Sequence, residues 1–122
     1  MPRLLRLAFW AALLFTFVMA TLPHPPQLPG QPIDKVQHIL AFVTLTGLAV
    51  AAWPGASLLR LFLGLSGFGA LIELVQAIPA LHRSSDWRDW VADAAAILVV
   101  LALAAGFSRV RRRGTEYPAA RR

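Results

Sequence analysis

The feature that most constrains this chain is a set of four apolar runs, each close to the length of a membrane-spanning helix. They cover residues 4–22, 36–53, 58–78 and 90–107. A helix needs about 20 apolar residues to cross about 30 Å of hydrocarbon, where every backbone polar group must be hydrogen-bonded internally. The runs show no alternation of period two and are too long for strands. We therefore expect an all-α fold, an integral membrane bundle of four transmembrane helices.

Composition agrees with a membrane protein. Of the 122 residues, 57% are apolar and 15% are charged, whereas soluble domains average about 45–50% and about 25%. The length allows one domain, and the absence of cysteine excludes disulfides, thiolate nucleophiles and cysteine metal sites. We place this domain at residues 1–108 and expect residues 109–122 to form a disordered, basic cytoplasmic tail.

The first run has an alternative interpretation. Its basic start and the small residues near positions 19–21 resemble a cleavable signal peptide. However, residues 7–22 carry no charge, and three further runs follow. We therefore favour an uncleaved first helix. The prolines of segment 21–32, Pro54 with Gly55, and Pro79 mark the ends of the runs.

The distribution of basic residues predicts the orientation. With four spans, both termini and the 53–60 loop share one side, which holds nine of the 12 Lys and Arg residues: Arg3, Arg6, Arg60 and the six arginines after residue 108. The other side holds Lys35, Arg83 and Arg88. Positive loops stay inside, so both termini are expected in the cytoplasm, with the chain in the bacterial inner membrane as a multi-pass protein. Basic clusters flanking apolar runs favour lipid headgroups as partners, and we expect no nucleic-acid partner.

The polar residues of the apolar region gather toward the opposite, outer end of the predicted bundle. They are Asp34, Lys35, His38, Glu73, Gln76, Arg83, Asp86, Asp89 and Asp93. Asp34 and His38 are four residues apart and share a helix face. Glu73 and Asp93 lie inside apolar runs, and an ionisable residue within a membrane is a functional-site candidate.

Each of these residues also has a purely structural interpretation. Asp34 could be a helix N-cap, and Asp86 and Asp89 could be first-turn acids that complement a helix dipole. Glu73 could form a structural ion pair with Arg83. The small residues Gly64, Gly67, Gly69 and Ala70 on the third run, and the alanines at 92 and 94–96, predict close helix packing.

Taken together, the polar motifs resemble those of the VanZ-like family. The motifs are Asp34-Lys35-x-x-His38, Glu73-x-x-Gln76 and Arg83-x-x-Asp86-x-x-Asp89-x-x-x-Asp93, and the resemblance spans roughly residues 33–103. It implies a small bacterial membrane protein; the founding members are associated with low-level teicoplanin resistance. Two departures stand out: Asp93 replaces a common Asn and adds a charge, and Ala94-Ala95-Ala96 replaces a Gly-rich continuation.

The favoured hypothesis is a non-catalytic envelope factor. Its outward polar cluster would bind a cell-wall precursor or a lipid headgroup and alter susceptibility to teicoplanin-type lipoglycopeptides. Arg83 and Lys35 would contact a phosphate or carboxylate, and Glu73, Asp86 and Asp89 would hold those cations in place. This hypothesis requires no cofactor and no metal.

The alternative is an enzyme that acts on a lipid-linked substrate at the outer leaflet. His38 would be the general acid or base, tuned by Asp34 or Glu73, with Arg83 stabilising developing charge. One variant places a divalent cation among His38, Glu73, Asp86 and Asp89.

Two further hypotheses remain for the same residues. A proton relay through Glu73 and Asp93 would need a homo-oligomer, because four helices are few for a carrier. A structural salt-bridge cluster would have no ligand at all.

Overall fold

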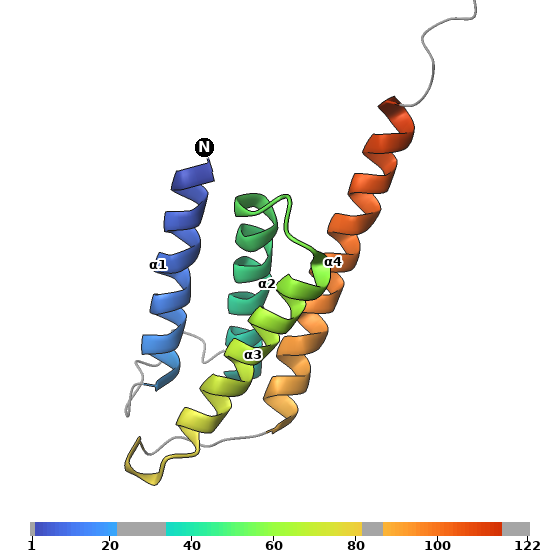
Figure 1. Cartoon of the computed structure of the whole chain (residues 1–122). Coiled ribbons are helices and arrows are strands. Elements are labelled where there is room, and N and C mark those ends of the chain that lie inside the picture. Colours follow the sequence, from blue (N-terminus) through green and yellow to red (C-terminus); the bar gives the residue numbers. More distant parts are fainter. Residues whose placement is uncertain (1, 22–33, 82–86, 116–122) are drawn as a thin grey trace, which may run out of the picture.

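The computed structural model of the chain describes residues 2–21, 34–81 and 87–115. Within these ranges it consists of α1 (Pro2–Thr21), α2 (Asp34–Ala52), α3 (Leu58–Gln76), the 3₁₀ helix η1 (Pro79–Leu81) and α4 (Trp87–Thr115) (Figure 1). The expected all-helical fold is confirmed for the part of the chain described. The bounds of α1, α2 and α3 lie close to those of the first three apolar runs.

Three of the four helices have the length and apolar composition to cross a membrane. These segments are Pro2–Thr21, Leu58–Gln76 and Trp87–Gly114, whereas the apolar part of α2, Val36–Ala52, is shorter. Large apolar side chains also cover the outside of the bundle, among them Leu7, Leu14, Leu59, Leu74 and Leu103. A surface of this kind suits contact with lipid chains rather than water.

The breaks between helices follow the predicted turn residues. After Trp53 the chain turns through Pro54 and Gly55, and the Ala56 amide donates to the Trp53 carbonyl at 3.0 Å. Ser57 then caps α3, with its hydroxyl accepting from the Arg60 amide at 3.2 Å. This bond satisfies one of the amides that a helix start leaves without an intrahelical partner.

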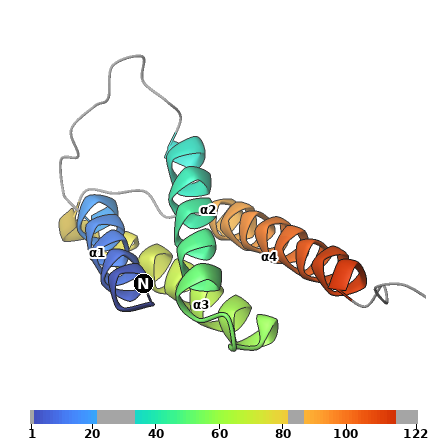
Figure 2. The same ribbon diagram turned by 90° about the horizontal axis from the view of Figure 1, so that it is seen from above.

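The core lies where α2 contacts both α1 and α4, and where α3 packs on α4 (Figure 2). Phe42, Leu45, Ile72 and Ile97 are fully buried there. Phe42 and Leu45 are three residues apart on α2 and so lie on the same helix face. The helices therefore meet through ordinary apolar contacts along most of their length.

Helix α1 is attached to the bundle at both of its ends. Near its start, Arg6 Nε donates to the Ala52 carbonyl at 3.3 Å, and its guanidinium lies 5.7 Å from the Trp53 ring centroid. Near its end, the Ala20 carbonyl accepts from Gln76 Nε2 at 2.8 Å. Both carbonyls belong to the last turn of a helix, where no intrahelical donor is left for them. Side chains of neighbouring helices supply the missing donors.

Helix α4 continues past the expected end of the domain, to Thr115. The predicted disorder of the basic tail is therefore wrong for residues 109–115, and residues 116–122 lie outside the described part. Arginine is a good helix former, and adding residues to an existing helix is far cheaper than starting one. Arg112 and Arg113 also lie in the last turn, where positive charge complements the helix dipole.

The expected role of the small residues on α3 is wrong for two of the glycines. A Cβ built on Gly64 or Gly67 has nothing within 4 Å, so neither glycine is needed for a close helix approach. At Gly69, a Cβ would lie 3.3 Å from Phe42 Cζ, 3.4 Å from Asp93 Oδ2 and 3.5 Å from Trp90 Cδ1. Of the three glycines of α3, Gly69 is thus the one at which the helix packs closely against its neighbours.

Candidate functional site

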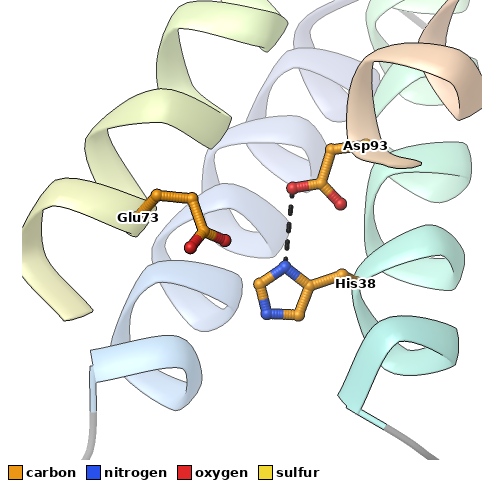
Figure 3. A group of neighbouring side chains, drawn as sticks. All are labelled: His38, Glu73 and Asp93. Atoms are coloured by element: carbon orange, nitrogen blue, oxygen red, sulfur yellow. Dashed lines mark hydrogen bonds and ion pairs between the residues drawn. The ribbon is translucent and has the colours of Figure 1, made fainter. Parts of the chain in front are cut away.

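Three ionisable side chains from three helices meet inside one end of the bundle. His38 comes from the first turns of α2, Glu73 from the last turn of α3, and Asp93 from the first turns of α4. This is the end at which α2 and α4 begin and α3 finishes, so residues near helix termini become neighbours (Figure 1). Figure 3 shows the three side chains directed toward a common space.

The defined contact in this group joins α2 to α4. Nδ1 of His38 lies 3.5 Å from Oδ2 of Asp93, and the two side chains are 11% and 0% exposed. That separation is at the long limit of a hydrogen bond, since N–H···O bonds usually measure about 2.7–3.2 Å. The other carboxylate oxygen of Asp93, Oδ1, is buried and has no hydrogen-bond partner among the described residues.

Glu73 brings a second carboxylate into the same space, and it is 7% exposed. One ligand atom from each of His38, Glu73 and Asp93 can be chosen so that all three lie within 4.8 Å of one another. Two carboxylates this close in an apolar surrounding repel each other and lose hydration. The arrangement therefore has the donor set and spacing to hold a cation, or to accept hydrogen bonds from a donor-rich ligand.

Neighbouring residues of α3 and α4 shape the space around Asp93. Gly69 lies against Asp93 Oδ2 because it has no side chain. Trp90, one turn before Asp93, donates from Nε1 to the Ser66 carbonyl at 3.0 Å and thereby fixes α4 on α3. The sequence predicted close helix packing at Gly69 but not its contact with Asp93, and the role of Trp90 was missed. The spacing of Ser66, Gly69 and Glu73 along one helix was the available signal.

The structure brings together only part of the predicted polar set. Asp89 is half-buried on α4 and does not belong to the group of three. Gln76 is buried, but its amide donates to the Ala20 carbonyl of α1. Asp34 and Lys35 are the first two residues of α2, and their side chains are outside the described part. Arg83 and Asp86 lie outside the described residues altogether.

The sequence analysis named Asp34 or Glu73 as the residue that tunes His38. The structure places Glu73 in the same group and adds a contact with Asp93, 55 positions along the chain from His38.

Comparison with known proteins identifies no relative: no protein family, no curated protein and no solved structure matches this chain. The VanZ-like resemblance thus stays a prediction from the polar motifs.

Proposed function

We propose that this chain is a VanZ-like, four-span protein of the bacterial inner membrane and acts as a non-catalytic envelope factor. In this proposal the site formed by His38, Glu73 and Asp93 binds the polar headgroup of a lipid or of a lipid-linked cell-wall precursor. The observation that carries the proposal is the convergence of these three side chains from three helices on one space. Burying a carboxylate in a membrane costs free energy, so two carboxylates held together there favour a role in ligand binding.

Four spans require α2 to cross the membrane as well. Its apolar part, Val36–Ala52, has 17 residues, which is the lower limit of about 17–25 for a spanning helix. Asp34 and Lys35 precede that stretch and would lie at the headgroup level. Four spans put both termini on one side, and the excess of arginine there favours the cytoplasm.

That topology puts the site at the outer leaflet. His38 follows the start of α2 by one turn, and Glu73 precedes the end of α3 by one turn. The group is therefore within reach of a headgroup without a deep channel. Carboxylate and imidazole acceptors suit a ligand rich in donors, such as sugar hydroxyls or a primary amine.

The test of this role is drug susceptibility in a Gram-positive host that expresses the chain at verified membrane levels. We expect protection against teicoplanin that exceeds any protection against vancomycin, and we expect Glu73→Gln to abolish it. Asp89→Asn is the control, because it also replaces a carboxylate by an amide, on α4 and outside the group of three. Unchanged susceptibility with well-expressed wild-type protein, or equal protection by Glu73→Gln, contradicts the role.

A second candidate, an enzyme on a lipid-linked substrate, is favoured by one observation. The contact between His38 Nδ1 and Asp93 Oδ2 orients the imidazole in the manner of a general base held by a carboxylate. In this alternative, His38→Gln abolishes product formation by purified protein, whereas a binding role is only weakened by the same change.

A further inference from the structure

We propose that His38, Glu73 and Asp93 form a binding site for a divalent transition-metal ion, with Zn²⁺ as the reference ion. One imidazole nitrogen and two carboxylate oxygens are the donor set, and each comes from a different helix. The sequence-based cation hypothesis drew on Asp86 and Asp89; the structure points to Asp93 in their place. The inference goes beyond headgroup binding, since an ion could occupy the site with or without a lipid ligand.

The spacing of the ligand atoms fits an ion. Zn²⁺ binds nitrogen and oxygen at about 2.0–2.2 Å, so two ligands of a tetrahedral site lie about 3.4 Å apart. His38 Nδ1 and Asp93 Oδ2 are separated by 3.5 Å, and each of the three residues offers one ligand atom such that the three lie within 4.8 Å of one another. A rotation of the Glu73 side chain is a small adjustment compared with moving a helix.

Asp93 supplies an independent observation. Its side chain is fully buried, yet Oδ1 has no hydrogen-bond partner among the described residues. A buried carboxylate oxygen without a donor loses its hydrogen bonds to water and gains none in the protein. Native structures contain few such groups. A metal ion would provide the missing interaction at this carboxylate.

Charge balance also favours a divalent ion. Two ionised carboxylates and a neutral imidazole carry two negative charges, which one divalent ion cancels. A neutral assembly is the least costly form of a charged site in an apolar surrounding. Imidazole among the donors favours Zn²⁺ and its first-row neighbours over Mg²⁺ or Ca²⁺, which prefer oxygen ligands alone.

Three protein ligands leave at least one coordination position for water or for a ligand atom. A bound ion would neutralise the two carboxylates, and its open coordination position would accept a phosphate oxygen. This consequence rests on the proposed headgroup binding, but the metal site itself does not. Metal content and drug protection are separate measurements, and each can fail while the other succeeds.

The experiment uses the full chain, purified in detergent with an affinity tag that contains no histidine. The protein is stripped with a chelator, equilibrated with Zn²⁺, passed through a desalting column and analysed for metal per chain. We expect one ion per chain in the wild type. We expect affinity to fall by about tenfold or more in Asp93→Asn and His38→Gln, because each loses a direct ligand.

Two controls define the site. Asp89→Asn keeps the three ligands and should bind as the wild type does. The double variant His24→Gln/His82→Gln removes the two other histidines of the chain and should also retain the ion. The inference is overturned if the stripped wild type takes up no Zn²⁺. It is equally overturned if Asp93→Asn binds as tightly as Asp89→Asn.

A measurement on the wild type tests the metal site even if Asp93→Asn does not fold. X-ray absorption of the Zn²⁺-loaded protein should show one imidazole together with oxygen ligands. An all-oxygen shell, or more than one imidazole, would place the ion elsewhere and overturn the inference.

Discussion

Gly69 is the residue on which the fit of the site most depends. A methyl group there would lie 3.3 Å from Phe42 Cζ, which is tighter than usual, and would be in van der Waals contact with Asp93 Oδ2 at 3.4 Å and with Trp90 Cδ1 at 3.5 Å. Phe42 and Asp93 are both fully buried, so neither can move aside without disturbing the core. The glycine therefore sets how closely α3 approaches α4 beside the carboxylate.

We predict that Gly69→Ala destabilises the protein relative to Gly67→Ala by about 1–3 kcal/mol, the usual cost of overpacking a core. Gly67 lies two residues away on the same helix with open space at its Cβ, so its change to alanine should be neutral or stabilising by up to about 1 kcal/mol. Equilibrium unfolding of both variants in the same detergent measures the difference. Equal stability of the two would show that the approach at Gly69 is not tight.

The residues of the candidate site were predictable from the sequence, but their grouping in space was not. His38, Glu73 and Asp93 were all in the predicted polar set, because ionisable residues inside apolar runs are conspicuous. Their grouping was not predictable, since it depends on how α2, α3 and α4 are rotated about their axes. Helical periodicity gives neighbours on one helix, such as Asp34 for His38, and says nothing of a contact 55 residues away.

At the scale of elements, the apolar runs predicted where each of the four α-helices lies, with the exception of the end of α4. The prolines and glycines placed the turns, and Ser57 caps α3 where the chain re-enters a helix. The end of α4 was missed because hydropathy marks where a run of apolar residues stops and not where a helix stops. Its basic last turns are polar, yet they have good helix propensity.

The elements also explain why the site lies where it does. Helix α1 contributes none of the three site residues, yet Gln76 holds its last turn against the end of α3. Trp90 holds α4 on α3 through the Ser66 carbonyl. These two bonds fix α3 on either side of Glu73, so the carboxylate is carried by a segment attached to two neighbours.

At the scale of the whole molecule, both described ends of the chain lie toward the same end of the bundle (Figure 1). The proposed topology places that end in the cytoplasm. We predict that alkaline phosphatase fused after Thr115 is inactive and that the same enzyme fused after residue 33 is active. This enzyme requires disulfides, which form only in the oxidising space outside the inner membrane. An active fusion after Thr115 would reverse the orientation and place the site in the cytoplasm.

The central claim is that the carboxylate of Asp93 is held in the bundle for a ligand and not as a structural clasp to His38. The most direct test is the unfolding free energy of metal-free Asp93→Asn, with Asp89→Asn alongside. Asparagine keeps the shape and removes the buried charge. The account predicts that the unfolding free energy of Asp93→Asn is within about 1 kcal/mol of the wild-type value or higher. A buried charge that serves ligand binding destabilises the protein when no ligand is bound. A loss of about 3–5 kcal/mol, the cost of breaking a buried ion pair, would contradict it and make the His38–Asp93 contact structural.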